Sequence, residues 1–252
     1  MKTNANIVLV AFAVAVACTN TQAGPIFSGP IVQVVPEVLE VVKAIQTDPE
    51  VAENNIDPLE GLNRSVYSLN QGLDKGLLKP LATVYKTVVP SFARQGVNNF
   101  LAYLHTPLDV LNYALQGNGV MAGDAMGRFM LNTFGFGVLD IASEAGISRK
   151  QTGFGETLGV WGAPAGPYVV LPLFGGRSLR GTVGTLGDSQ FGAAGQLKVH
   201  EQTSVIVLDA LDTRTRLLGV EDLMSEAALD EYSFVRDALM QREKNRVEEL
   251  KE

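Results

Sequence analysis

The sequence predicts a mainly α fold, a helical domain that also contains a Gly/Pro-rich segment of short strands and loops. Two observations support this prediction. From residue 57 to residue 134, apolar residues recur at steps of three or four, which is the spacing of one face of a helix. Between Leu158 and Gly176 that pattern stops, and the segment has five glycines, three prolines and no charged residue. The prolines disfavour a membrane-spanning helix there, so we expect short strands, with Tyr168–Leu171 as the best candidate.

The first eighteen residues have the pattern of an export signal. An unbroken apolar run from Ile7 to Ala17 is too short to span a bilayer as a helix, but it has the length of a signal-peptide core. The run ends in small residues before Cys18, the single cysteine of the chain. We therefore predict a signal peptide over residues 1–17 and lipidation of Cys18. The alternative is ordinary cleavage after Ala17 or Ala23, since both follow a small-x-small pattern.

The composition sets the remaining boundaries and limits binding through charge. Thr19–Pro36 is rich in Pro, Gly and small polar residues, so residues 18–56 are expected to be a lipidated N-terminus and tether. The domain is then expected over residues 57–242, followed by a charged tail at 243–252. Only 19% of the 252 residues are charged and the net charge is -7, which argues against a nucleic-acid partner. Any membrane contact should therefore be apolar or covalent.

The strongest helical signal begins at Asp57-Pro58. Aspartate is a good N-cap, and proline suits the first helical position. Pro80 must kink or divide the segment, because proline lacks a backbone N–H. A stripe of this kind usually packs in a core, and the alternative is burial in a membrane interface. The residues of the stripe are Leu59, Leu62, Val66, Leu69, Leu73, Leu77, Leu81, Val84 and Val88.

Further helices are expected along the rest of the chain. Before the Gly/Pro-rich segment, one covers about Ser91–Leu104 and a second starts at Thr106-Pro107. A turn is expected at Gly117–Gly119, and a third helix covers Val120–Phe134. After it, residues 181–195 are expected to be loop-like or weakly helical. Helices then return over the ranges Glu201–Leu218 and Leu223–Lys251.

Arg128 stands in an otherwise apolar part of the expected helix 120–134. Asp124, Arg128 and Asn132 are spaced four residues apart and therefore share one helix face. Two interpretations stay open at this point. Arg128 pairs with Asp124 across one helical turn, or it faces a polar cavity and meets a phosphate head group.

The sequence contains no convincing catalytic set. It has no nucleophile elbow, zinc-protease motif or phosphate loop, and its only histidines are His105 and His200. Gly153–Gly159 loosely resembles a nucleotide loop but lacks a preceding hydrophobic strand, so a packing turn is the better interpretation. We therefore expect no enzyme activity, no cofactor and no metal site.

Several blocks of residues resemble the MlaA (VacJ) lipoprotein family, in order, from about Asp57 to Arg242. Because the blocks are many and keep their order, the resemblance is specific. The matching residues are Asp57–Arg64, Arg128–Thr133 with Gly135, Gly137 and Asp140, Phe154–Gly159 with Trp161-Gly162 and Gly166–Pro172, and Asp212–Arg214 with Tyr232.

This resemblance implies a fold and a function. The family fold is a compact, ring-like helical domain set in the outer membrane of a Gram-negative bacterium, lipid-anchored on the periplasmic side, with an amphipathic channel through it. The family removes misplaced phospholipid from the outer leaflet and passes it to a soluble periplasmic carrier, which maintains lipid asymmetry. It also associates with trimeric porins. We expect the same substrate and partners here.

The resemblance also implies roles for particular residues. The region 57–88 would lie along the membrane, with Leu62, Val66, Leu69, Leu73 and Leu77 toward the lipid. The loop Phe134–Asp140 would gate the channel, and its expected site residues are Arg128, Asn132, Gly135, Gly137 and Asp140.

Two functions from other classes are the alternatives. An exported lipid-modifying hydrolase would need a Ser or Asp nucleophile with a histidine partner, and only two histidines exist. A structural anchor that links the membrane to a partner would need no transport site.

Overall fold

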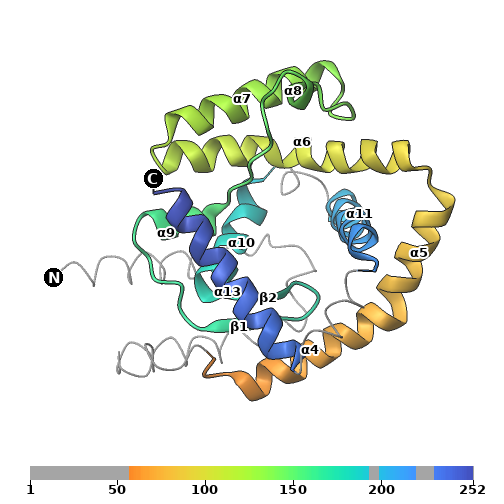
Figure 1. Cartoon of the computed structure of the whole chain (residues 1–252), viewed down its shortest axis with the longest axis vertical. Coiled ribbons are helices and arrows are strands. Elements are labelled where there is room, and N and C mark those ends of the chain that lie inside the picture. Colours follow the sequence, from red (N-terminus) through yellow and green to blue (C-terminus); the bar gives the residue numbers. More distant parts are fainter. Residues whose placement is uncertain (1–56, 193–198, 220–229, 252) are drawn as a thin grey trace. The chain divides into compact units, whose positions relative to one another are not determined.

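The structure is a computed structural model that describes residues 57–192, 199–219 and 230–251. The expected signal peptide, Cys18 and the tether lie outside these residues. The described chain is mainly helical with one short two-stranded sheet, which confirms the expected fold class (Figure 1). None of its helices combines the length and the apolar character needed to cross a membrane. The elements are α4 (Glu60–Leu73), η2 (Asp74–Leu78), α5 (Lys79–Val88), α6 (Ser91–Leu115), α7 (Gly119–Phe134), α8 (Ile141–Glu144), α9 (Phe154–Val160), β1 (Tyr168–Leu171), β2 (Gly175–Ser178), α10 (Leu179–Phe191), α11 (Val199–Leu217) and α13 (Glu231–Glu249).

The chain folds into two compact units, and each is built from separated stretches of sequence. Unit 1 comprises Met1–Gly72, Leu158–Gly184 and Ala228–Glu252, as far as these residues are described. Unit 2 comprises Leu73–Thr157 and Thr185–Ala227, with the same restriction.

Pro80 changes the helix type without ending the helix. The backbone stays helical from Glu60 to Val88, but residues Asp74–Leu78 form a π-helical turn just before the proline. There the N–H of Lys79 bonds to the carbonyl of Asp74, one residue further back than in an α-helix. Pro80 then takes a first-turn position of α5, where its missing N–H is not needed. The expected kink or division therefore takes the form of a π-helical turn.

The expected break at Thr106-Pro107 is wrong, because α6 runs through it without interruption. A proline inside a helix removes one hydrogen bond and costs about 3 kcal/mol. Packing offsets this cost: α6 packs along α7 and buries Leu101, Leu108 and Tyr113. A local sequence signal could not reveal this packing.

The turn between α6 and α7 matches the expectation. Gly117 adopts a positive φ of 77°, which is strained for other residues. Asn118 then caps α7, since its side chain accepts a hydrogen bond from the N–H of Met121 at 3.1 Å. The two helices therefore fold back on one another as a hairpin (Figure 1).

The core of unit 1 forms around the expected strand. Tyr168–Leu171 is β1, it is buried along its whole length, and it pairs antiparallel with β2 so that Tyr168 faces Ser178. Tyr168 and Val170 from β1 pack with Tyr232 from α13. The partly buried residues around this cluster are Val66, Tyr67, Leu239 and Met240.

The C-terminal helix extends past the expected domain boundary at Arg242. α13 continues to Glu249, and Val247 is buried against the backbone of Gly159. Glu243 accepts hydrogen bonds from the N–H of Ser178, at 3.1 Å, and from its hydroxyl. Much of the stretch 243–252 is therefore part of the packed unit.

Candidate functional site

Unit 2 brings together the residues that the sequence singled out around the loop after α7. Arg128 and Asn132 lie one turn apart on α7, and both are only 6% exposed. Asp140 stands at the far end of the loop and caps α8, where it accepts a hydrogen bond from the N–H of Ser143. The loop that contains Gly135 and Gly137 is therefore closed at its base by buried polar side chains.

Arg128 is held by acceptors from the chain itself. Its Nη2 lies 2.8 Å from Oδ1 of Asp140, and its Nη1 donates to Oγ of Ser143 at 3.1 Å and to the carbonyl of Ile147. Asp124, the other partner considered from the sequence, is exposed, and Arg128 pairs with Asp140 instead. This ion pair fixes the start of α8 against α7.

Asn132 and Asp140 complete the closure. The amide of Asn132 donates to Oδ1 of Asp140 at 3.1 Å, while its carbonyl oxygen accepts from the N–H of Ala142 at 2.9 Å. Burial by itself raises the pKa of Asp140, but hydrogen bonds from Ser143, Asn132 and Arg128 outweigh burial and hold that pKa below its usual value. Asp140 is therefore an ionised latch.

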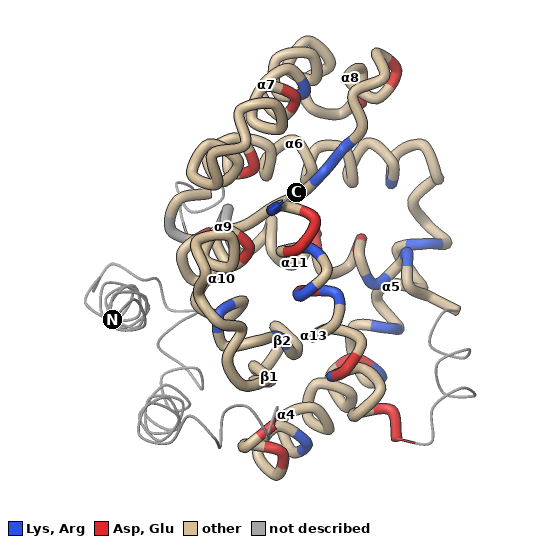
Figure 2. Tube along the Cα trace, turned by 60° about the vertical axis from the view of Figure 1, so that its left-hand side comes forward, with Lys and Arg blue, Asp and Glu red and all other residues tan. Residues whose placement is uncertain are grey.

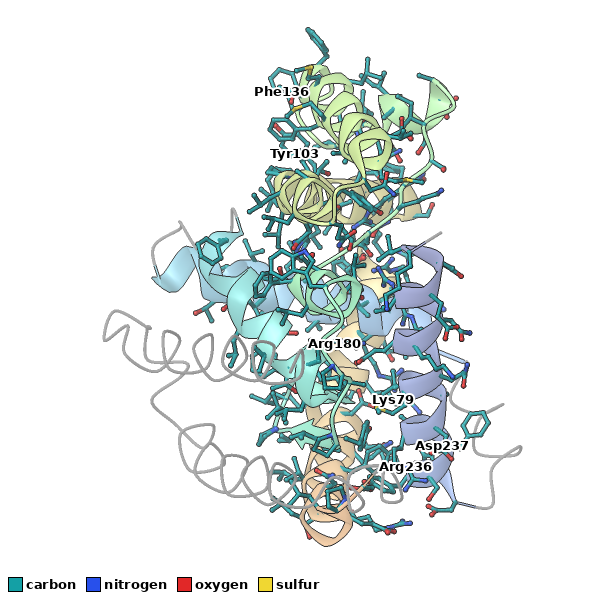
Figure 3. The ribbon with its side chains drawn as sticks, turned by 90° about the vertical axis from the view of Figure 1, so that its left-hand side faces the viewer. Lys79, Tyr103, Phe136, Arg180, Arg236 and Asp237 are labelled. Atoms are coloured by element: carbon teal, nitrogen blue, oxygen red, sulfur yellow. The ribbon has the colours of Figure 1, made fainter. Side chains whose placement is uncertain are left out.

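The loop backbone rests closely on α6. Gly137 has a φ of 72°, and a Cβ there would lie 2.6 Å from the ring of Tyr103. Asn99 donates to the carbonyl of Val138 at 2.9 Å. Phe136 also has a positive φ, of 52°, and it is 85% exposed. In Figure 3 the labels place Phe136 and Tyr103 on the same side of the α6–α7 hairpin.

The distribution of polar residues on α7 is inverted relative to a water-soluble helix. Arg128 and Asn132 are buried, whereas Met130 and Phe134 are exposed, Phe134 by 80%. Charged residues are also sparse along α6 and α7 (Figure 2). This pattern is typical of a surface that faces an apolar medium.

The apolar stripe of α4, η2 and α5 is likewise exposed over most of its length. Leu62 and Val66 are half-buried, and the stripe residues from Leu69 to Val88 are 38% to 72% exposed. The buried residue of α4 is the polar Asn63, and that of α5 is the small Ala82. The core interpretation of this stripe is therefore wrong for residues Leu69 onward. The physical reason is that the opposite face of α4 bonds to β1 through Asn63 and Asn70, whereas the opposite faces of η2 and α5 meet side chains of α11, Arg214 and Thr215.

The first block of the sequence resemblance has a structural role in unit 1. Asp57 is buried and accepts hydrogen bonds from the hydroxyl of Tyr232 and, at 2.7 Å, from the amide of Asn63. Burial, and then the hydrogen bond to Asp57, raise the pKa of Tyr232. Asn63 also bonds to one edge of β1: its amide nitrogen donates to the carbonyl of Tyr168, and its amide oxygen accepts from the N–H of Val170. These residues join the start of α4 to the sheet and to α13.

Some residues of the site were missed from the sequence. Ser143 follows Asp140 at the spacing of an N-capping pair, so that signal was available. Asn99, Tyr103 and the carbonyl of Ile147 gave no signal, because only the fold brings them to the loop. Among the described residues, no cluster of three or more His, Cys, Asp or Glu side chains is placed to hold a metal.

Comparison with known proteins gives one consistent result. A family model described as MlaA lipoprotein matches residues 55–246. The "Intermembrane phospholipid transport system lipoprotein MlaA" of Escherichia coli (strain K12) is 36% identical over 192 residues, covering 74% of this chain and 76% of that protein. The protein of the same name from Haemophilus influenzae is 31% identical over 199 residues, covering 76% and 79%.

A solved structure is also similar. It is described as "Structural basis for maintenance of bacterial outer membrane lipid asymmetry", and it superposes with a TM-score of 0.70 at 34% sequence identity. The match covers 76% of this chain and 98% of that chain.

An uncharacterized protein of Rickettsia bellii is 32% identical over 189 residues, covering 73% of this chain and 74% of that protein.

Proposed function

The chain belongs to the MlaA lipoprotein family, and from this we propose that it is an outer-membrane lipoprotein of intermembrane phospholipid transport. It removes phospholipid from the outer leaflet through an amphipathic channel and passes it to a soluble periplasmic carrier. The process maintains the lipid asymmetry of the membrane. Cys18 carries the lipid anchor, and a trimeric porin is the expected membrane partner.

The observation that carries this proposal is the inverted polarity of the helices. α7 buries Arg128 and Asn132 while it exposes Phe134, and the stripe from Leu69 to Val88 is exposed. Exposed apolar side chains are favourable only where another apolar phase covers them. A membrane supplies acyl chains to cover the exposed apolar side chains, while the buried Arg128 and Asn132 keep their polar partners within the protein. Leu69, Leu73 and Leu77 are the residues proposed to lie along the lipid, with the half-buried Leu62 and Val66 at the edge of this surface, where Val66 also packs against the core of unit 1.

The loop from Gly135 to Asp140 is the proposed gate of the channel. Its base is held by the ion pair of Arg128 with Asp140 and by Asn132, whereas its tip is exposed. Gly135 and Gly137 supply the backbone freedom that a hinge needs. The ion pair at the base of the loop is sensitive to pH, whereas the exposed apolar tip is sensitive to contact with acyl chains.

Transport is tested by the lipid composition of the outer leaflet. In a deletion strain, a membrane-impermeant amine reagent should label more phospholipid at the cell surface than in the parent, and the wild-type chain should reverse this. Equal labelling in both strains excludes transport and favours the structural anchor. Lysophospholipid that appears only when the protein is present would instead favour the hydrolase.

The gate is tested separately by a disulfide. A Cβ at Gly96 would lie 2.9 Å from Cγ1 of Val138, so Gly96→Cys with Val138→Cys is within reach of a disulfide that ties the loop to α6. Oxidation should stop transport, and a reducing agent should restore it. Val138→Cys alone is the control, and it should be insensitive to oxidation. Full transport by the oxidised double variant excludes the gate but leaves the transport proposal intact.

A further inference from the structure

A carboxylate of unit 2 is buried where three helices meet. Asp212 on α11 is 2% exposed, and α11 packs against both α5 and α6 (Figure 1). Oδ2 of Asp212 has no hydrogen-bond partner in the described residues. Water solvates a carboxylate in the unfolded chain, so burying one with an unsatisfied oxygen weakens the folded state.

A hydroxyl on α5 that lies within the electrostatic influence of Asp212 also lacks a hydrogen-bond partner in the described residues. It belongs to Tyr85 and is buried. Burial and then the charge of Asp212 raise the pKa of Tyr85. About one turn after Asp212, the hydroxyl of Thr215 donates to the carbonyl of Ala82 at 3.4 Å, so α11 and α5 are in direct contact here. Two unsatisfied polar groups are therefore enclosed at one helix junction.

Positive charges around Asp212 compensate only part of its burial. Nε of Arg216 lies 3.3 Å from Oδ2 without forming a hydrogen bond, and that side chain is 53% exposed. Arg94 on α6 attracts the carboxylate from further away, and Asp209 on α11 repels it. Arg214 is paired with Asp74 at 2.6 Å. Burial is the largest effect and raises the pKa of Asp212.

We propose that Asp212 is a proton-dependent clasp that seats α11 against α5 and α6. When Asp212 is ionised, its buried charge weakens the junction, and a proton removes that charge. This device goes beyond lipid transport and does not depend on it. Since α5 exposes apolar residues from Leu81 to Val88, the clasp links proton uptake to a helix with a large apolar surface.

The sign of the pH dependence follows from linkage. A group with a raised folded-state pKa adds stability that is complete below its unfolded value, about 3.9 for aspartate, and is lost as the pH rises through the folded value. The packing of α11 against α5 and α6 should therefore be most stable in acidic solution and should become less stable toward neutral pH.

Amide hydrogen exchange of α11 in the full chain tests the clasp. After correction for intrinsic exchange, protection of residues 205–217 should be severalfold higher at pH 4.5 than at pH 7.5, because the raised pKa of Asp212 leaves part of the folded population protonated at the lower pH. Asp212→Asn should lose this gain of protection in acid, and any remaining change should have the opposite sign, because burial lowers the pKa of His105 on α6, which lies within the electrostatic influence of Asp209 of α11. The matched control is Asp237→Asn, an exposed aspartate on α13, which should keep the pH dependence of the wild type.

Two results overturn the clasp: a wild type whose α11 protection does not rise in acid, and a rise of protection in acid that survives in Asp212→Asn. Tyr85→Phe covers the case in which Asp212→Asn fails to fold. It removes the unsatisfied hydroxyl and leaves the carboxylate buried, so α11 should be better protected at every pH and keep its pH dependence. Loss of that dependence in Tyr85→Phe would also overturn the proposal.

Discussion

Two aspartates of unit 2 show that burial alone does not fix the charge state of a residue. Asp140 and Asp212 are both desolvated, yet the pKa of Asp140 is lowered and that of Asp212 is raised. The difference lies in the donors: Asp140 accepts from Ser143, Asn132 and Arg128, whereas Oδ2 of Asp212 accepts no hydrogen bond in the described chain. Hydrogen bonds to the ionised form are therefore decisive.

Asp140→Asn should destabilise unit 2 by about 3 kcal/mol at neutral pH, since it leaves Arg128 buried without a counter-charge. Because the folded pKa of Asp140 is lowered, its contribution is present above the unfolded value and is lost as the pH falls below about 4. Urea unfolding at pH 7 and pH 3.5 measures both effects. The gap between wild type and variant should narrow in acid. Asp124→Asn, at an exposed position of the same helix, should show neither effect.

Gly137→Ala should destabilise the loop more than Gly117→Ala does. Both glycines have a φ between 70° and 80°, so both substitutions meet the same backbone strain, about 1 kcal/mol. A Cβ at Gly137 also meets the ring of Tyr103 at 2.6 Å, whereas nothing lies within 4 Å at Gly117. Thermal unfolding of the two variants isolates the contact. Equal melting temperatures would mean that the ring moves aside at no cost.

At the scale of the element, the spacing of apolar residues predicted a helix but did not show whether its apolar face meets a protein core or a membrane. The steps of three and four in the region 59–88 predicted a helix, and the helix formed with a π turn before Pro80. The same steps did not show which medium faces the stripe. A core and a bilayer select the same apolar residues, so the exposure of Leu69 to Val88 became visible only once the rest of the fold was in place.

Leu69→Asn with Leu77→Asn should weaken membrane binding without loss of fold. Both side chains are more than half exposed, so their replacement creates no core cavity. Each leucine withdrawn from an interface removes roughly 2 kcal/mol of apolar transfer energy, so vesicle cosedimentation of a chain with Cys18→Ala should fall by tenfold or more. Ser68→Asn with Lys75→Asn, at exposed polar positions of the same segment, is the control. Unchanged cosedimentation of the leucine variant would remove the stripe from the membrane contact.

At the scale of the whole molecule, distant stretches of the chain complete each unit. In unit 1, Asp57 meets Tyr232, and Ser178 meets Glu243, although these partners are far apart in the sequence. In unit 2, Asp74 pairs with Arg214 through two hydrogen bonds of 2.6 and 2.8 Å. Neither unit can therefore form from one continuous segment.

A chain that ends at Arg242 should be less stable than the full chain by about 3 kcal/mol. The truncation removes the buried side chain of Val247, and it removes the carboxylate of Glu243, which leaves the N–H and hydroxyl of Ser178 without that acceptor. A chain that ends at Leu250 keeps both and serves as the control. Chemical unfolding of the two chains compares them directly. Equal midpoints would place the true boundary of the domain at Arg242.

The sequence by itself determined the helical class, the strand Tyr168–Leu171, the turn before α7 and the family. These depend on local periodicity, on glycine and proline geometry, and on motifs that keep their order along the chain. It also singled out Arg128, Asn132 and Asp140, since their spacing and their place in the family blocks are visible in one dimension.

Only the tertiary structure decided the partner of Arg128, the passage of α6 through Pro107 and the burial of Asp212. Each of these depends on which distant residues supply a counter-charge, a packing surface or a hydrogen-bond donor. Such contacts join positions tens of residues apart, and an ion pair or an unsatisfied oxygen has no periodicity to reveal it. The physical reason is that the environment of a side chain belongs to the packed fold, whereas a sequence pattern fixes only the local backbone and the polarity of its faces.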